Sequence, residues 1–397
     1  MLERRDVLKG LAAGAGASAL AGPRTVLARA PTDRRLVVVI LRGGLDGLTA
    51  LPPVGEQDYY RARPRIAVPR PGERNGAIDL NGDFGLHPAL KPLRDLYRAG
   101  EMLAVPAVGI PARTRSHFDA QDVLENGTAR ARGARDGWLN RAVLALGGGP
   151  ERIALSVGHG VPLILRGSAP VRTWEPSFLP RADDAFLDRL AGLYESDPLF
   201  AKALKAARMS ALKAPRGMGG AARRAARGDA ARVLASAAGK LLAQADGPRI
   251  AVIEAGGWDT HVNQSGQLGN LLPHLARGLV TLKDTLGPVW ARTAVLVVTE
   301  FGRTVKENGG RGTDHGTGGL ALVLGGAVRG GRIAGRWPGL AKSARFEGRD
   351  LMPATDLRSL AKGVLRDHLR LPERAIEDRV FPASRRARPM GGLIRGA

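Results

Sequence analysis

The strongest constraint on the fold is a set of nearly uninterrupted apolar runs. They show no alternation of polar and apolar residues, which is typical of strands that are buried on both faces of a parallel sheet. Segments with helical periodicity separate most of them, and this order favours an α/β fold with a mostly parallel central sheet between helical layers. The runs are Leu36–Leu41, Met102–Val105, Ile250–Ile253, Ala294–Thr299 and Leu320–Leu324.

The connection between the last two runs has no room for a crossover helix. It is a glycine-rich loop that contains Asn308–Gly316 and runs straight into the next strand. We therefore expect these two strands to be antiparallel, which returns His315 to the sheet edge at which Glu300 lies. Shorter strands are expected at Ile153–Leu155 and Pro162–Leu165.

The helical segments and the domain limits follow from periodicity and from capping residues. Residues 183–245 are Ala-rich and helical in pattern, and we interpret them as a helical hairpin inserted into a single domain of residues 31–383. Residues 384–397 resemble a basic, loosely held tail. Four further helices are expected at about 87–97, 117–126, 267–286 and 356–369.

The first 30 residues have the features of a twin-arginine signal peptide. Arg4 and Arg5 precede a weakly apolar run, Gly10–Ala21, and Ala28-Arg29-Ala30 offers a cleavage site. We expect the twin-arginine export machinery to be a partner and the mature protein to be periplasmic or secreted. No later stretch is apolar enough to cross a membrane. The alternative interpretation of this segment is a disordered basic tail.

The composition limits the chemistry and the partners of this chain. Cysteine is absent, so disulfides and thiolate metal sites are excluded and only histidines and carboxylates remain as strong ligands. The net charge of +23 attracts polyanions. The excess arginine is spread along the whole chain, without a patch that interleaves basic and aromatic residues, so we expect no specific nucleic-acid binding.

Three carboxylates follow the carboxyl ends of strong strands. Asp46, Asp259 and Glu300 occupy these positions, and ligands of open α/β sheets bind at this edge. Three anions placed together repel one another unless a cation lies between them. His261 and His315 would add nitrogen ligands, so the pattern predicts a site for one or two divalent ions. A loop aspartate that caps a helix, beside a surface histidine, is the alternative.

The motifs of this chain, in their order, resemble the domain of unknown function 1501 family. They are the twin-arginine leader, LRGGLDGL, RSHFDAQD, GGWDTH, VVTEFGR and GTDHGTGG, and together they cover essentially the whole mature chain. That family looks like a branch of the alkaline phosphatase and sulfatase superfamily. The resemblance implies an alkaline-phosphatase-like fold with divalent metal, such as zinc, manganese or calcium, at the carboxyl edge of the strands.

The resemblance also implies roles for the candidate ligands. Asp46 corresponds to the metal aspartate after the first strand of the superfamily. Asp259 and His261 are similar to the Asp/His pair of one metal, although the superfamily commonly spaces the two more widely. His315 resembles the last histidine of that metal. Glu300 stands where the superfamily usually has an Asp-His pair.

The catalytic residues are implied by the same resemblance. The segment that contains Ser116 and His117 resembles a nucleophile segment, with either Arg115 or Ser116 in the place of the nucleophile. Ser116 would attack once its oxygen is activated by the metal, and His117 would protonate the leaving oxygen or orient Ser116. Arg42, Arg115 or Arg303 would clamp the anionic group.

Two functions remain open from the sequence. The first is an exported metal-dependent hydrolase of phosphate or sulfate esters, acting on a small anionic ester or a polyanionic substrate. The second is a non-catalytic extracytoplasmic protein that keeps the fold for assembly with an exported partner. Phe301, which stands where a second metal site would have a histidine, favours the second.

Overall fold

The computed structural model describes residues 32–147, 153–176, 184–212 and 230–396. The predicted signal peptide, residues 1–30, lies outside these ranges. Within them, no helix combines the length and the hydropathy that are needed to cross a bilayer.

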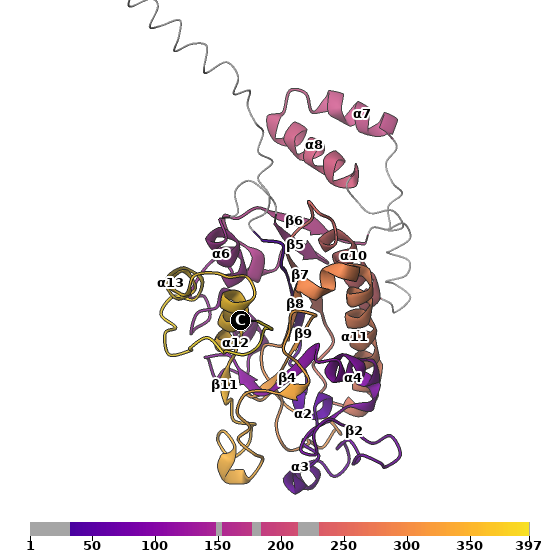
Figure 1. The fold of residues 1–397 in the computed structure, drawn as a ribbon, viewed down its shortest axis with the longest axis vertical. Coiled ribbons are helices and arrows are strands. Elements are labelled where there is room, and N and C mark those ends of the chain that lie inside the picture. Colours follow the sequence, from indigo (N-terminus) through magenta and orange to yellow (C-terminus); the bar gives the residue numbers. More distant parts are fainter. Residues whose placement is uncertain (1–31, 148–152, 177–183, 213–229, 397) are drawn as a thin grey trace, which may run out of the picture.

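A mixed, mostly parallel sheet forms the centre of the described residues (Figure 1). Its order is β10-β4-β9-β8-β1-β7-β5-β6, and β11 pairs with β4. β1 is parallel to both of its neighbours, β7 and β8, whereas β9 is antiparallel to β8 and β4. The strands are β1 Arg35–Leu41, β4 Met102–Gly109, β5 Ala154–Val157, β6 Val171–Trp174, β7 Ile250–Ala255, β8 Thr293–Val298, β9 Gly319–Leu324, β10 Arg332–Ile333 and β11 Thr355–Asp356, with a separate hairpin of β2 Ile78–Asp79 and β3 Gly85–Leu86.

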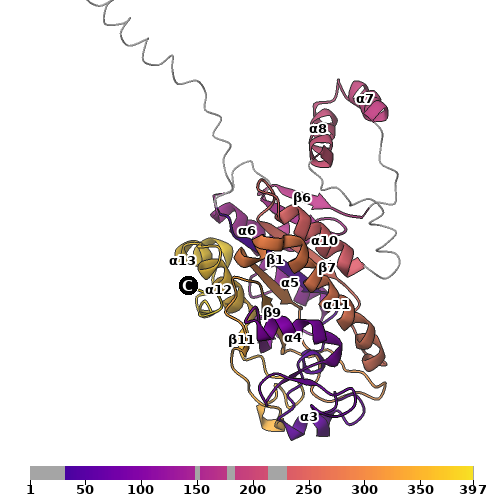
Figure 2. The ribbon, with the colours of Figure 1, turned by 45° about the vertical axis from the view of Figure 1, so that its right-hand side comes forward.

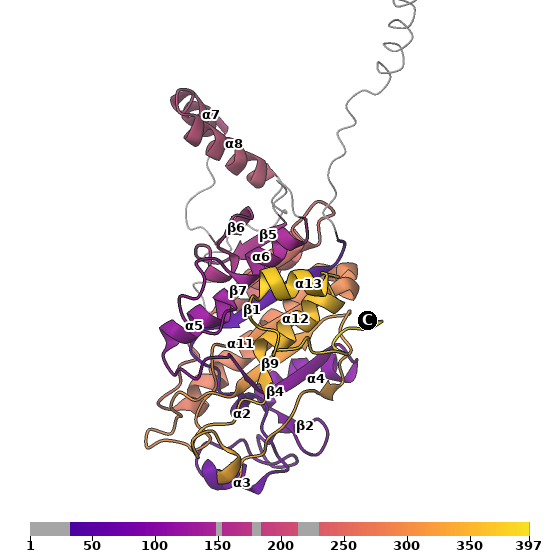
Figure 3. The same ribbon diagram turned by 90° about the vertical axis from the view of Figure 1, so that its left-hand side faces the viewer.

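Helices cover both faces of this sheet. Alternate residues of β1 belong to two different cores: Val38 packs with residues of α5, α6 and α12, and Val39 packs with residues of α4, α10 and α11. Figure 2 shows α10 and α11 on one side of the sheet and α12 on the other, and in Figure 3 α12 lies in front of the strands. The helices are α2 Gly47–Ala50, α3 Gln57–Ala62, α4 Lys91–Arg98, α5 His117–Asn126, α6 Trp138–Ala145, α7 Asp184–Leu193, α8 Pro198–Leu212, α10 Ala230–Leu242, α11 Gln264–Leu286, α12 Leu357–Asp367 and α13 Glu373–Ala375.

The predicted fold class, a mostly parallel sheet between helical layers, is confirmed. The antiparallel pairing of β8 with β9 is confirmed as well. The prediction of a strand at Pro162–Leu165 was wrong, because Leu163–Leu165 forms a 3-10 turn whose residues Ile164 and Leu165 are buried in the core. Apolar residues in so short a run do not distinguish a buried turn from a strand.

The inserted segment contains three helices in the described ranges. α7 and α8 stand away from the sheet in all three views, whereas α10 packs along α11 and contributes Val233, Ala235 and Leu242 to the buried core. The expectation of a loosely held tail was wrong for residues 384–396. Leu393 and Ile394 are buried in the core, and the amide of Arg329 donates to the carbonyl of Leu393.

Candidate metal centre

The carboxyl ends of β1, β7 and β8 lie side by side, since β1 pairs in parallel with the other two. Asp46, Asp259 and Glu300 follow these three ends. The turn after β1 is pressed against the segment after β7: Gly43 has a φ of +120°, and a Cβ on it would lie 2.5 Å from the amide nitrogen of Asp259. Only glycine fits there without displacing that segment.

Three imidazole nitrogens converge on the Asp259 carboxylate. The Nε2 atom of His261 lies 2.9 Å from Oδ1, the Nε2 atom of His315 lies 3.1 Å from Oδ1, and the Nε2 atom of His117 lies 3.3 Å from Oδ2. The Nε2 atoms of His261 and His315 are only 2.9 Å apart. One ligand atom from each of His117, Asp259 and His315 lies within 4.8 Å of the others.

The tautomers of two of these histidines follow from their other ring nitrogens. Nδ1 of His117 lies 2.8 Å from the Glu300 carboxylate, and Nδ1 of His315 lies 2.8 Å from the carbonyl oxygen of Arg115. Both oxygens only accept, so each Nδ1 carries the proton and donates it. A neutral imidazole then presents a lone pair at Nε2, and both lone pairs face Asp259.

His117 contributes a nitrogen whose lone pair is available to a metal ion. Its Nε2 atom is buried and has no hydrogen-bond partner among the described residues. A buried nitrogen without a partner is costly, and an acceptor lone pair is satisfied by a proton donor or by a metal ion. Donation of the opposite nitrogen to a carboxylate, here that of Glu300, is the usual arrangement around a metal-bound histidine.

The electrostatics of the cluster keep Asp259 and His315 in their metal-binding protonation states. Burial disfavours the charge of Asp259, but the hydrogen bond and the positive charge of Arg303 outweigh it, and the pKa of this carboxyl is lowered to about 2. Burial lowers the pKa of His315, which favours its neutral form. An ionised carboxylate beside neutral imidazoles is the donor set that divalent metals bind.

The donor set fits a zinc-like ion. Three imidazole nitrogens and a carboxylate are ligands of borderline metals, and a tetrahedral ion with bonds of ~2.0 Å separates its ligand atoms by about 3.3 Å. The contacts of 2.9 and 3.1 Å that His261 and His315 make with Oδ1 of Asp259 are close to that separation, and His117 contacts the other carboxylate oxygen at 3.3 Å. The site is open to solvent, because the side chains of Asp259 and His261 are 43% and 39% exposed.

Arg303 is the buried cation of the site. Its guanidinium donates to the carbonyls of Gly43, Gly44 and Trp258, and to Oδ1 of Asp259 at 2.5 Å. The side chain is 0% exposed. Arg303 therefore ties the turn after β1 to the segment after β7 and also places a positive charge against Asp259.

The structure places Glu300 behind His117 rather than among the converging ligand atoms. Its Oε1 atom accepts from the Gly43 amide, from His117 and from Gln121, and its Oε2 atom accepts from Thr299. Burial raises the pKa of Glu300, but these donors outweigh it, so the pKa is lowered and the carboxylate stays ionised. Its direct contact with the cluster is the hydrogen bond that orients His117.

Asp46 is also separate from the converging nitrogens. Both of its oxygens accept from the guanidinium of Arg63, and they also accept from Thr49 and Gln264. Asp46 caps α2 by accepting from the Leu48 amide. This fully buried ion pair fixes α2 and the segment after α3 to the sheet edge.

The remaining candidates have other partners. Arg42 pairs with Glu125 and Glu254. The Arg115 side chain pairs with Glu347 and Asp350, while its carbonyl oxygen accepts a hydrogen bond from Nδ1 of His315. Both guanidinium groups are thus neutralised by carboxylates.

Ser116 is the N-cap residue of α5, directly before His117. It is exposed, and its side chain makes no capping hydrogen bond. The hydroxyl is therefore not consumed by the structural role that serine most often performs at a helix start.

Some residues of the site had no clear signal in the sequence. His117 joins the ligand nitrogens although the sequence suggested an acid or an orienting role for it. Gln121 follows one helical turn later and supports the same Glu300, so the i, i+4 spacing in RSHFDAQD was an available signal. Arg63, the partner of Asp46, directly follows α3 and had none.

Comparisons with solved structures find distant likenesses. The chain is similar to a protein in the alkaline phosphatase superfamily from Vibrio parahaemolyticus, with 11% identity, a TM-score of 0.32 and coverage of 75% of this chain and 62% of that one. It is also similar to the lipoteichoic acid synthase LtaP from Listeria monocytogenes, with 10% identity, a TM-score of 0.32 and coverage of 77% and 67%. The chain thus spans less than two thirds of the Vibrio protein.

Sequence comparison is more specific. No curated protein matches the chain. One family model matches residues 99–378, well over half of the sequence. The matched range contains the candidate site residues His117, Asp259, His261, Glu300 and His315. The chain therefore belongs to the family described as "Protein of unknown function (DUF1501)".

Proposed function

We propose that this protein is a metal-dependent hydrolase of phosphate or sulfate esters. The observation that supports it most is the convergence of three imidazole Nε2 atoms on the half-exposed carboxylate of Asp259. Two of these nitrogens have lone pairs directed at Asp259, and a divalent cation bound between them would stabilise this group of electron pairs. His117, Asp259, His261 and His315 would hold one divalent ion, with zinc, manganese and calcium as the candidates.

The bound ion would act as a Lewis acid on an ester oxygen and favour the ionised form of a nucleophile. The residues around it would do the positioning. Glu300 would orient His117, and the carbonyl of Arg115 would orient His315. Arg303 would add a fixed positive charge at the same edge, and this charge favours an anionic substrate.

Ser116 is the proposed nucleophile. Its exposed hydroxyl is one residue from a proposed ligand, His117, and lies at the start of α5, where backbone N–H groups favour anions. Arg42 and Arg115 are weaker candidates for binding the anionic group of the substrate, since each guanidinium already pairs with two carboxylates. The substrate class is a small anionic ester, consistent with the net charge of +23.

We also propose that the protein acts outside the cytoplasm. The support is the twin arginine and the A-x-A site in residues 1–30. Replacing Arg4 and Arg5 by lysine would retain the precursor in the cytoplasm if this segment directs export.

A non-catalytic role is the second candidate. The neutralisation of Arg42 and Arg115 favours it, because these were two of the three expected clamps for an anionic group. In that role the ion would stabilise the sheet edge for assembly with an exported partner, and no ester would be turned over.

Hydrolysis of generic aryl phosphate and aryl sulfate esters tests the proposal. The protein is loaded with zinc, manganese or calcium, and product release is followed by absorbance. We expect turnover that a chelator abolishes. Ser116→Ala is expected to lower it by about 10³-fold without loss of bound metal, because the nucleophile acts only in the reaction.

Two variants make the result interpretable. Asp259→Asn removes the carboxylate on which the nitrogens converge and should abolish both metal binding and turnover. His159→Ala, at a 92% exposed histidine near β6, is the matched control and should change neither. Metal-loaded protein without any turnover would favour the non-catalytic role, and full activity of Ser116→Ala would exclude this serine as nucleophile.

A further inference from the structure

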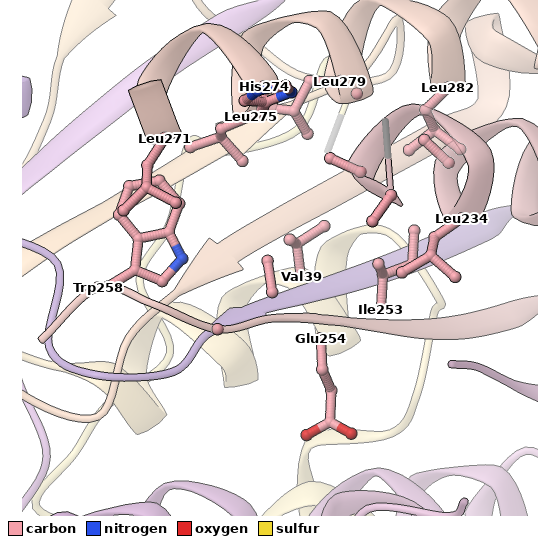
Figure 4. A pocket seen from close by; sticks show the side chains of 16 residues that line it. Val39, Leu234, Ile253, Glu254, Trp258, Leu271, His274, Leu275, Leu279 and Leu282 are labelled. Atoms are coloured by element: carbon pink, nitrogen blue, oxygen red, sulfur yellow. The ribbon is translucent and has the colours of Figure 1, made fainter. Parts of the chain in front are cut away.

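A cavity lies between the sheet and the helices α10 and α11, next to the candidate metal centre. It has a volume of about 290 Å³ and is enclosed by β1, β7, α10 and α11 (Figure 4). This volume is near the lower end of the ~300–1,000 Å³ range of small-molecule sites. Trp258, which lines it, is the residue directly before Asp259.

The wall of this cavity is almost entirely apolar. Leucines of α10 and α11 face Val39 and Ile253 of the sheet, as Figure 4 shows. Glu254 is the one acidic residue of the lining, but its carboxylate pairs with Arg42 and points away from the leucines in Figure 4. His274 is engaged with Arg277 at 3.1 Å. The described lining therefore favours a neutral ligand.

One polar atom is directed into this apolar space. The indole Nε1 of Trp258 is buried and has no hydrogen-bond partner among the described residues. The whole residue is 2% exposed. In Figure 4 its nitrogen is turned toward the space bounded by Val39 and Leu275. A buried tryptophan normally finds an acceptor for this N–H, so the donor requires one from outside the described residues.

The backbone of Trp258 is tied to the same segments as the candidate metal centre. Its amide donates to the carbonyl of Arg42 at 3.3 Å, and its carbonyl accepts from Arg303 at 3.1 Å. Both contacts belong to the turn and the arginine that also hold Asp259. The main chain that carries the indole is therefore anchored to the sheet edge, and the ring itself is packed in the buried core.

We propose that this cavity binds a neutral aliphatic molecule with one oxygen acceptor, which receives the N–H of Trp258. The leucine wall would take the hydrocarbon part, and the absence of an unpaired charge in the described lining excludes carboxylates and ammonium groups as the preferred ligands. A straight-chain alcohol has the required chemistry. This site is distinct from the proposed metal site and does not depend on ester hydrolysis.

Calorimetric titration of the full chain with straight-chain alcohols from butanol to decanol tests the proposal. We expect saturable binding of one molecule per chain. The affinity should rise about four-fold with each added CH₂ until the cavity is filled, as burial of a methylene predicts. Absence of saturable binding across the series would overturn the proposal, including the case in which another part of this chain fills the cavity.

Two substitutions test the N–H donor of Trp258 and the apolar lining of the cavity separately. Trp258→Phe keeps an aromatic ring but removes the N–H, and we expect hexanol to bind about five-fold more weakly while hexane, which has no acceptor, is unaffected. Leu234→Trp fills the rim of the cavity and should abolish binding of both. Trp337→Phe, outside the cavity, is the control. Melting temperatures verify folding, and unchanged binding of hexanol to Trp258→Phe or to Leu234→Trp would contradict the site.

Discussion

At the scale of single residues, the site is defined by what the second nitrogen of each histidine contacts. Glu300 accepts from Nδ1 of His117, and the Arg115 carbonyl accepts from Nδ1 of His315. These acceptors fix the tautomers and leave Nε2 of both rings available at Asp259. We therefore expect the groups behind the proposed ligands to contribute to metal affinity as well.

Glu300→Gln tests this directly. The amide keeps the size of the side chain but removes the charge that holds His117 in one tautomer, so we expect metal affinity to fall by about 10–100-fold in a calorimetric titration. Glu175→Gln changes an exposed carboxylate near β6 and should leave the affinity unchanged. If Glu300→Gln binds metal as tightly as the wild type, Glu300 does not position His117.

The sequence indicated part of this site. Asp259, His261 and His315 were predicted as ligands from their positions at strand ends, and they do lie together. Glu300 and Asp46 were predicted at the same edge, but each has its own buried partners. Strand ends determine which residues reach an edge, whereas the direction of each side chain depends on packing that one sequence does not contain.

At the scale of elements, the buried pair of Asp46 and Arg63 links α2 to the residue that follows α3. Both side chains are at most 1% exposed. Burial opposes the charge of each, but their mutual attraction and hydrogen bonds lower the pKa of Asp46 and raise that of Arg63, so the pair stays ionised. Removing one member leaves a buried charge without a partner.

We therefore expect Arg63→Met to destabilise the protein by about 3–5 kcal/mol in urea unfolding. Arg61→Met, at an exposed position of α3, is the matched control and should have little effect. Metal affinity of folded Arg63→Met should match that of the wild type. If Arg63→Met has unchanged stability but no longer binds metal, the result would instead indicate that Asp46 is a metal ligand, as the sequence predicted.

The elements themselves were predictable to different degrees. The long apolar runs gave the central strands, and the short loop between β8 and β9 gave their antiparallel pairing. The 3-10 turn at Leu163–Leu165 and the buried Leu393 were missed. In both segments a few apolar side chains are buried against other parts of the fold. The local sequence pattern does not show which short apolar segments will be buried in this way.

At the scale of the whole molecule, the buried His368 and the partly buried His87 make the fold sensitive to acid. Burial lowers the pKa of both His87 and His368 to about 4. His368 donates from Nε2 to the carbonyl of Arg35, its Nδ1 has no described partner, and the nearby charges of Arg34 and Arg370 further oppose protonation. The unfolded chain, with pKa values near 6.5, then binds more protons than the folded chain between pH 4 and 6.5.

The stability contributed by neutral His368 is present above pH 6.5 and is lost as the pH falls toward 4. Between pH 7 and pH 5 this amounts to about 2 kcal/mol for a shift of this size. We expect His368→Gln to show a correspondingly smaller loss of stability between these pH values in urea unfolding. His274→Gln, at a partly exposed position, is the control. An equal loss in His368→Gln and the wild type would exclude His368 as the source.

Metal content measures the central claim most directly. Protein purified without chelator is dialysed against zinc, manganese or calcium, and bound metal is quantified by mass spectrometry alongside the melting temperature. The account predicts one ion per chain, a higher melting temperature with metal because the ion binds only the folded state, and loss of both in a His117→Ala, His315→Ala double variant. A wild type that binds no divalent ion, or a double variant that binds as much as the wild type, would contradict it.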